Sequence, residues 1–193
     1  KFGKDQLYMS QAQTCLCGNQ ASLKFVLKYE VYKCTNCDLF FAPNAKFKAD
    51  FQSVLDEDAR VKALKELRIE NYNRIISVMD EYLPPNAFGL EVGSAYGWFL
   101  EVAKKHGYNC IGIEPEEKIW KISVEKGYEV IKGFFPNDIP EDIRELDFII
   151  FNDVLEHIPD IDSVLSVCRK LLKKDGLLII NIPQSTGFFY SLS

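Results

Sequence analysis

The stretch Gly89-Leu90-Glu91-Val92-Gly93-Ser94-Ala95-Tyr96-Gly97-Trp98-Phe99-Leu100 decides the fold of this chain. An apolar run from Phe88 ends at Gly93 in a turn of small residues, and helical periodicity resumes from Trp98. Glycine suits such a turn because the backbone bends sharply and a ligand must approach without a Cβ in its way. The stretch therefore predicts a strand, a glycine turn and a helix that together hold a nucleotide cofactor.

A second apolar segment, Tyr108 to Ile113, is followed by an acid, Glu114. Its separation from Gly93 along the chain is that of an acid at the tip of the neighbouring parallel strand, which accepts hydrogen bonds from both hydroxyls of a ribose. Glu114 is therefore a predicted ribose ligand.

Details of the turn separate the classes of cofactor. A dinucleotide-binding turn has the spacing G-x-G-x-x-G, which seats a pyrophosphate on the helix N-terminus. Here the spacing is Gly93-x-Ala95-x-Gly97, which disfavours an NAD-dependent dehydrogenase. Glu91, two residues before the first glycine, would repel a phosphate and attract a cationic ligand.

Four segments of the chain resemble motifs of the class I S-adenosylmethionine-dependent methyltransferases, whose ligand carries a sulfonium and an α-ammonium. Residues 91–97, acid-x-Gly-x-x-x-Gly, resemble motif I, and residues 112–115 resemble the second motif. Residues 152–158 resemble the fourth motif and residues 171–179 the fifth, in the order of the family. The resemblance implies S-adenosylmethionine as cofactor. The implied binding residues are Glu91, Gly93, Ser94, Ala95, Tyr96, Gly97, Glu114, Pro115, Phe134, Phe135, Asn152, Asp153 and Val154.

Two departures from the family pattern bear on this site. Ala95 stands where the family more often has a glycine. After the predicted third strand the family commonly places an acid that accepts from the adenine amino group, whereas this chain has Phe134 and Phe135. Contact with adenine is then mainly apolar, with Asp138 as the candidate if an acid contributes. Taken singly, Gly93 and Gly97 also fit ordinary turn glycines, and Glu91 and Glu114 also fit solvated strand ends.

His157 follows the predicted fourth strand, and a residue just past the end of a strand faces the ligand crevice. An imidazole there is a candidate catalytic base for the proton of the acceptor, because its unperturbed pKa is close to neutral pH. The alternative is that His157 caps or packs the next helix beside Pro159.

Four cysteines near the N-terminus form two close pairs, Cys15 with Cys17 and Cys34 with Cys37. Four thiolates satisfy a tetrahedral Zn²⁺, so the pairs predict two knuckles joined by a hairpin, a zinc ribbon. The first pair is C-x-C, shorter than the usual C-x₂-C. Residues 1–14 lack an apolar signal-peptide stretch, which favours a reducing, cytoplasmic location over disulfides. Free structural thiols are the remaining alternative.

Composition agrees with one domain and a small module in 193 residues of which 47% are hydrophobic. No apolar run approaches the length of a membrane span. Residues 1–50 carry a net charge of +3 and residues 51–193 a net charge of −8. An acidic catalytic domain disfavours nucleic acid and favours a small-molecule acceptor.

The predicted organisation is a zinc ribbon at 1–50, connecting helices at 51–85 and an S-adenosylmethionine-binding domain at 86–193. Alternating strands and helices predict an α/β fold with a doubly wound parallel Rossmann-like sheet. By resemblance the strand order is 3-2-1-4-5, and two further strands are expected beyond it, so the domain is expected to be C-terminally incomplete. Strands are expected at about 88–93, 109–114, 128–132, 146–152 and 177–182, and helices at about 97–106, 116–126 and 161–173.

The expected activity is transfer of a methyl group from S-adenosylmethionine to a small acceptor. A ribbon joined to such a domain resembles methyltransferases that methylate carbon of nucleotide-linked deoxysugars, whereas other ribbon-bearing relatives act on ribosomal RNA. The alternative is a non-catalytic, degenerate methyltransferase fold that presents its ribbon to a protein or RNA. Ala95, the absent adenine acid and the expected lack of C-terminal strands favour this alternative. The residues that favour the enzyme are the intact Glu91, Gly93, Gly97 and Glu114.

Overall fold

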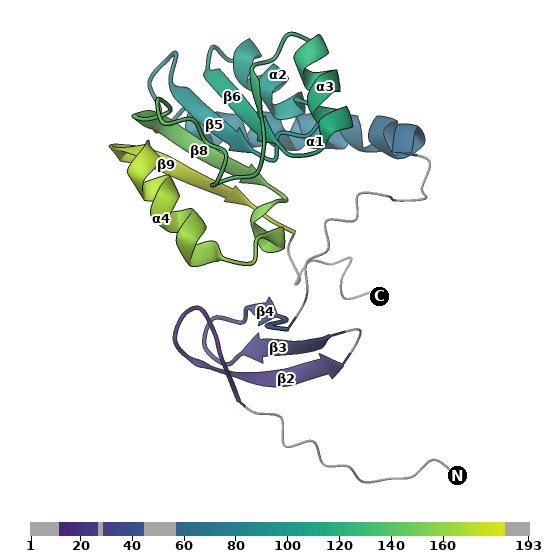
Figure 1. Ribbon diagram of the computed structural model, residues 1–193, viewed down its shortest axis with the longest axis vertical. Helices are drawn as coiled ribbons and strands as arrows, with labels where there is room; N and C mark the ends of the chain where they lie inside the picture. Colours follow the sequence, from purple (N-terminus) through teal and green to yellow (C-terminus); the bar gives the residue numbers. More distant parts are fainter. Residues whose placement is uncertain (1–11, 27–28, 45–56, 184–193) are drawn as a thin grey trace. The chain divides into compact units, whose positions relative to one another are not determined.

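The computed structural model describes residues 12–26, 29–44 and 57–183. The chain divides into two compact units, residues 1–49 and residues 50–193, and each unit has its own sheet (Figure 1). Below, they are called the N-terminal unit and the larger unit.

The N-terminal unit is an antiparallel sheet in the order β1-β2-β3-β4. Strands β2 and β3 form a hairpin whose register runs from Ala21 opposite Cys34 to Val26 opposite Glu30, so the end of β3 returns to the start of β2. This pairing brings the second cysteine pair back towards the first. The strands are β1 (Gln13–Thr14), β2 (Gln20–Val26), β3 (Glu30–Cys34) and β4 (Phe40–Phe41).

The larger unit contains a five-stranded parallel sheet in the order β7-β6-β5-β8-β9. Numbered along this unit alone, the order is 3-2-1-4-5, which confirms the predicted doubly wound topology. The strands are β5 (Phe88–Val92), β6 (Asn109–Glu114), β7 (Val130–Lys132), β8 (Leu146–Asn152) and β9 (Leu172–Asn181).

Helices cover both faces of this sheet (Figure 1). On β8, Phe148 and Ile150 pack with residues of α1 and α2, whereas Ile149 and Phe151 pack with residues of α4. Because successive side chains of a strand point to opposite faces, this central strand is apolar on both sides. The helices are α1 (Glu57–Met79), α2 (Trp98–Lys105), α3 (Glu117–Glu125), the 3₁₀ helix η1 (Leu155–His157) and α4 (Ile161–Leu171).

The junction of α4 and β9 differs from the prediction. The helix ends at Leu171, and β9 begins at the next residue because Leu172 pairs with Leu146. The last two residues of the helix predicted at 161–173, and Gly176 before the strand predicted at 177–182, therefore lie inside β9. A Cβ added to Gly176 would be 2.9 Å from the carbonyl oxygen of Leu146.

Of the predicted connecting region 51–85, the described helical part is α1, which ends at Met79, before Pro84 and Pro85. From residue 64 on, where its side chains are described, the buried ones are Tyr72, Ile76 and Met79, which follow helical spacing. Residues 51–56 of the predicted connecting region, and residues 184–193, lie outside the described residues.

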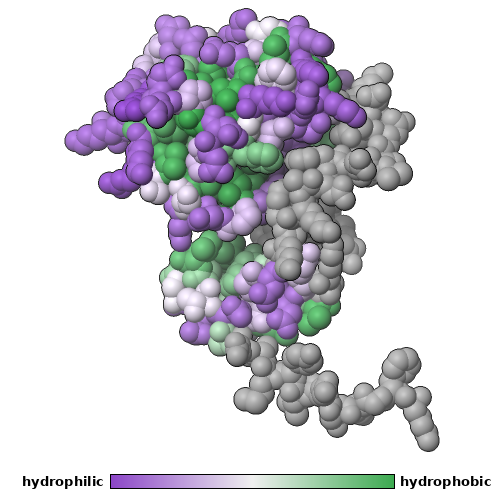
Figure 2. All heavy atoms as spheres, in the orientation of Figure 1, coloured by the Kyte–Doolittle hydropathy of each residue, from purple (hydrophilic) through white to green (hydrophobic). Residues whose placement is uncertain are grey.

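Among the described helices, none has the length and apolar character needed to cross a lipid bilayer. Figure 2 shows polar side chains over much of the visible surface, with apolar ones between them. In the described part of the N-terminal unit, residues 12–26 and 29–44, the exposed large apolar residues are Leu16, Phe25, Val26 and Leu39.

Candidate cofactor site and cysteine cluster

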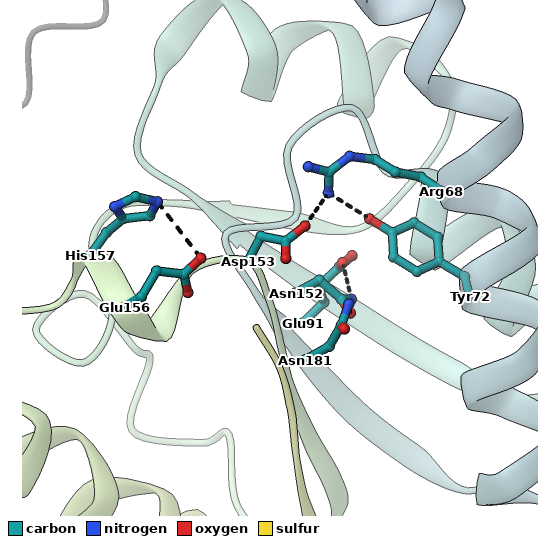
Figure 3. A network of polar contacts seen from close by, with 8 residues as sticks. All are labelled: Arg68, Tyr72, Glu91, Asn152, Asp153, Glu156, His157 and Asn181. Carbon is teal, nitrogen blue, oxygen red and sulfur yellow. Dashed lines mark hydrogen bonds and ion pairs between the residues drawn. The ribbon is translucent and has the colours of Figure 1, made fainter. Parts of the chain in front are cut away.

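Polar side chains gather where the parallel strands of the larger unit end. Glu91 is the next-to-last residue of β5, and Glu114, Asn152 and Asn181 are the last residues of β6, β8 and β9. Because the strands are parallel, these four side chains lie at one edge of the sheet, where open α/β sheets bind ligands. Figure 3 shows Glu91, Asn152 and Asn181 next to one another.

The carboxyl group of Glu91 is buried, with 2% of the residue exposed. The amide of Asn152 donates to Glu91 Oε1 at 3.0 Å, and the amide of Asn181 donates to Asn152 Oδ1 at 3.3 Å. Among the described residues, Glu91 Oε2 has no hydrogen-bond partner. Burial raises the pKa of Glu91 to about 8, the bond from Asn152 opposes this rise, and the nearby charge of Glu114 adds to it.

Helix α1 contributes two residues to this edge that carried no sequence motif (Figure 3). Arg68 pairs with Asp153, its Nη1 lying 2.9 Å from Oδ2, and also donates to the hydroxyl of Tyr72 at 3.4 Å. Burial, together with the charge of Glu91, raises the pKa of Tyr72 to about 12. A neutral phenol and an ion pair therefore flank the buried acid.

The turn after β5 leaves little room for side chains. Gly93 adopts a left-handed φ of 69°, and a Cβ added there would lie 2.6 Å from the side chain of Val154. Gly112 in the neighbouring strand is constrained by space alone, because an added Cβ would collide with Ser94 Oγ. The segments 91–97 and 112–115, which resemble two motifs of the family, thus depend on each other for close packing.

Glu114 joins the turn to the second strand. The backbone N–H of Ala95 donates to Oε2 and that of Glu116 to Oε1, both at 2.9 Å. Burial raises the pKa of Glu114 while these two bonds oppose the rise. Each carboxylate oxygen has a further lone pair, so the oriented group can still accept from two hydroxyls.

Other predicted site residues are distributed around this edge. Among the described residues, the buried Ser94 Oγ has no hydrogen-bond partner. The ring of Tyr96 stacks on Trp98, with ring centroids 5.2 Å apart. Pro115 follows Glu114 directly and is half-buried.

The two predicted adenine-contacting aromatics lie after β7 in different surroundings. Phe134 is half exposed, whereas Phe135 is buried in the core with its ring edge-on to Phe151. The carboxylate of Asp138 accepts from the backbone N–H of Phe134 at 2.7 Å, so this acid is engaged within its own turn.

His157 lies in η1 with 63% of its side chain exposed, and its Nε2 is 3.9 Å from Glu156 Oε1. Its role as a general base stays a prediction. The second histidine, His106, is the C-cap residue of α2.

The four N-terminal cysteines form one cluster. Their Sγ atoms all lie within 4.8 Å of one another, with Cys15 and Cys37 at 3.6 Å and Cys17 and Cys34 at 3.5 Å. A tetrahedral Zn²⁺ with bonds of about 2.3 Å places its sulfur ligands about 3.8 Å apart. The four free thiols therefore have the donor type, number and spacing of such a site.

Local hydrogen bonds favour the thiolate form at two of these cysteines. The backbone N–H groups of Cys37 and Asn36 donate to Cys34 Sγ at 3.4 Å and lower the pKa of Cys34. Backbone and side-chain bonds from Asn19 lower the pKa of Cys17 to about 6. Thiolates at this separation repel one another unless a cation lies between them.

The larger unit has the fold of S-adenosylmethionine-dependent methyltransferases. It resembles such an enzyme from Thermotoga maritima with a TM-score of 0.57 and 25% identity, over 71% of this chain and 62% of the other. A second, from Archaeoglobus fulgidus, has a TM-score of 0.59 and 22% identity, over 72% of this chain and 63% of the other.

The chain belongs to the methyltransferase domain family, which its residues 64–189 match. The C-methyltransferase NovU of Streptomyces niveus is 30% identical over 98 residues, which are 49% of this chain and 23% of NovU. A ubiquinone biosynthesis O-methyltransferase of Actinobacillus pleuropneumoniae serotype 7 is 32% identical over 113 residues, 53% of this chain and 48% of that protein. The chain thus spans a quarter to a half of the length of these curated relatives.

Proposed function

We propose that this chain binds S-adenosylmethionine at the carboxyl edge of its parallel sheet and transfers the methyl group to a small-molecule acceptor. The observation that carries the proposal is the buried Glu91, whose Oε2 has no hydrogen-bond partner among the described residues. A buried carboxylate oxygen is costly unless it is paired. A ligand with a sulfonium and an ammonium supplies positive charge and N–H donors of the kind this oxygen lacks.

The remaining residues of the edge fit the same ligand. Glu114, oriented by two backbone N–H groups, accepts from the ribose hydroxyls. The turn from Gly93 to Gly97 gives the backbone close access, and the hydroxyl of Ser94 is a further donor there. Asn152, Asp153 and Val154 line the neighbouring strand end, and the half-exposed Phe134 offers its ring to adenine.

The chemistry of the bound cofactor is a methyl group on a positively charged sulfur, which is open to attack by a nucleophile. The contribution of the protein is to hold the acceptor atom in line with that methyl group, and such positioning can be worth several kcal/mol. His157, exposed just past β8, is the candidate group that removes a proton from the acceptor.

For the acceptor we propose a nucleotide-linked sugar that is methylated on carbon. The similarity to the C-methyltransferase NovU supports methylation of carbon. The choice of a sugar rests on the resemblance of a cysteine-containing unit that precedes a methyltransferase domain in the sequence. The similarity to O-methyltransferases of ubiquinone biosynthesis supports the more general class of small acceptors. The net negative charge of the chain is unfavourable for RNA.

Calorimetry with S-adenosylmethionine and its demethylated product tests the binding half of the proposal. Incubation with methyl-labelled cofactor and a panel of nucleotide-linked deoxysugars, quinol precursors and ribosomal RNA tests the transfer half. Label in a sugar carbon supports the proposal, and label in RNA contradicts the proposed acceptor. Cofactor binding without transfer to any of the three would instead support the non-catalytic alternative.

We also propose that the four cysteines hold one Zn²⁺. Their sulfur atoms meet the geometric requirement of a tetrahedral thiolate site. Within the described part of the N-terminal unit, the fully buried apolar residues are Cys15, Ala21, Tyr32 and Cys34. So small a core gains much of its stability from a bound metal.

Replacing Glu114 by Ala is expected to weaken cofactor binding by about 10-fold to 100-fold, because one charge-assisted contact with the ribose is worth about 1.5–3 kcal/mol. Calorimetry on wild type and Glu114→Ala measures the change. The matched control is Glu125→Ala at the exposed end of α3, which should bind as wild type does. Equal affinity of wild type and Glu114→Ala would remove Glu114 from the site.

A further inference from the structure

Helix α3, which carries no cofactor motif, holds the turn after β5 through two consecutive carbonyl groups. The hydroxyl of Ser123 donates to the carbonyl oxygen of Ala95 at 2.7 Å. The ammonium of Lys126 donates to the carbonyl oxygen of Tyr96 at 3.0 Å. Residues 123 and 126 lie on one face of the helix because they are three positions apart. One face of α3 therefore contacts the backbone of the cofactor turn.

Ser123 is an unusual choice for its position. It is the one fully buried residue of α3, a helix that the structure describes from end to end. The buried side of a helix on a sheet is normally apolar. A buried hydroxyl needs a partner, and this one has the carbonyl of a residue 28 positions away. The contact with Ala95 is what accounts for a serine here.

Ala95 has an unfavourable backbone conformation. Its φ is 44°, in the left-handed region that favours glycine. Two hydrogen bonds hold the residue there from opposite sides: its N–H donates to Glu114 Oε2, and its carbonyl accepts from Ser123. Together these bonds offset the strain of an alanine at this point of the turn.

We propose that Ser123 is a positioning residue of the cofactor site, which acts through Ala95 on the carboxylate of Glu114. If Ala95 relaxes to a right-handed conformation, its N–H no longer points at Glu114. The carboxylate then keeps the bond from the N–H of Glu116 and is free to rotate about it. The identity of the ligand that Glu114 binds rests on the proposed function. The role of Ser123 rests on the geometry of the turn alone.

The first test is Ser123→Ala in the full chain. We expect binding of S-adenosylhomocysteine, measured by calorimetry, to weaken by about 5-fold to 20-fold, since an oriented hydrogen bond to a charged group is disturbed indirectly. Amide hydrogen exchange at position 95 in the unliganded protein should accelerate at least tenfold. The matched control is Ser77→Ala, which removes an exposed hydroxyl that donates to the carbonyl of Asn73 within α1. This control should change neither quantity.

The second test adds Ala95→Gly to Ser123→Ala. Glycine adopts the left-handed conformation without steric cost, so the bond from position 95 to Glu114 no longer needs support from α3. We expect the double variant to bind within about threefold of wild type and to regain amide protection at position 95. If Ser123 only packs the helix against the sheet, the double variant should remain as weak as Ser123→Ala alone.

The outcomes separate this inference from the proposed function. Wild-type affinity and exchange in Ser123→Ala overturn the positioning role, and so does a loss that Ala95→Gly leaves unrestored. If the wild-type chain binds no S-adenosylhomocysteine, the proposed function fails. Exchange at position 95 in the three variants still decides whether Ser123 positions the turn.

Discussion

Replacing Glu91 by Gln is expected to weaken S-adenosylmethionine binding by about 100-fold while making the unliganded protein more stable in alkaline solution. The first effect follows because a hydrogen bond to a charged, buried partner contributes about 1.5–3 kcal/mol. Glu91 is buried, and the proposed ligand is cationic. Gln keeps the shape and can accept the bond from Asn152 at Oε1. The substitution thus removes the charge and little else.

The stability effect has a defined pH window. The pKa of Glu91 is raised from 4.5 to about 8 in the folded chain. Between these values the folded chain holds a proton that the unfolded chain releases, so the free energy of unfolding falls as pH rises from 4.5 to 8, by at most about 1.4 kcal/mol per pH unit. Glu91→Gln has no such proton to lose. At pH 8.5 it should therefore be more stable than wild type by roughly 3 to 5 kcal/mol.

Two measurements check these expectations. Denaturant unfolding of the unliganded proteins between pH 4.5 and 8.5 should give a falling curve for wild type and a flatter curve for Glu91→Gln. Calorimetry over pH 6 to 9 should give a ratio of wild-type to variant affinity that rises with pH as Glu91 ionises. Titration of the ligand itself is common to both proteins and cancels in that ratio.

Glu125→Gln is the control for this pair of effects, because it makes the same chemical change at an exposed position at the end of α3. Its unfolding curve and cofactor affinity should match those of wild type. A Glu91→Gln protein that is less stable than wild type at pH 8.5 would show that the carboxylate stabilises the fold. An unchanged affinity would show that Glu91 does not face the ligand.

A substitution that weakens ligand binding but stabilises the unliganded fold is characteristic of a residue retained for function. A buried carboxylate with an unpaired oxygen is unfavourable in the unliganded chain, and a cationic ligand removes that penalty. Tyr72 on α1 has its own pKa raised by burial and by the charge of Glu91, so its hydroxyl stays neutral beside the acid. Burial and the charge of Glu114 disfavour the ionisation of Glu91, whereas the bond from Asn152 and the charge of Arg68 favour it.

The order of the sheet was predictable from the sequence because the deciding information is local. The strands β5, β6 and β8 are apolar runs with a glycine or an acid at or just after their ends, and the order of such motifs along the chain indicates the topology. The glycine turn and the acid at the end of β6 were placed correctly as neighbours, and the bond from Ala95 N–H to Glu114 is the physical link between them.

The site residues that the sequence analysis did not predict belong to no recognisable sequence motif. Arg68 and Ser123 lie on helices where any polar residue is compatible with helical periodicity, and their partners are distant in the sequence. Asn181 had one available indication, since it ends a strand as Asn152 does. The fourth helix was predicted to end at about residue 173 because Leu172 fits its apolar spacing, whereas Leu172 already pairs with Leu146 of β8.

Replacing Cys34 by Ser is expected to remove zinc from the chain and to unfold the N-terminal unit while the larger unit keeps its fold and its cofactor affinity. Cys34 is 1% exposed, ends β3 and lies 3.5 Å from Cys17 across the cluster. Structural zinc contributes its binding free energy to folding, about 10–16 kcal/mol in small metal-dependent domains. The buried residues described in this unit are too few to replace that contribution.

Elemental analysis of protein purified without chelator should find about one zinc per chain in wild type and almost none in Cys34→Ser. Amide exchange should show loss of protection over residues 12–44 in the variant and unchanged protection in β5, β6 and β8. Cys110→Ser, a thiol of β6 whose sulfur donates to a backbone carbonyl, is the matched control and should keep its zinc. Because the two units have separate sheets, a chelator added to wild type should reproduce the variant. A metal-free wild type with a protected N-terminal sheet would mean that the four thiols hold this unit together without a metal.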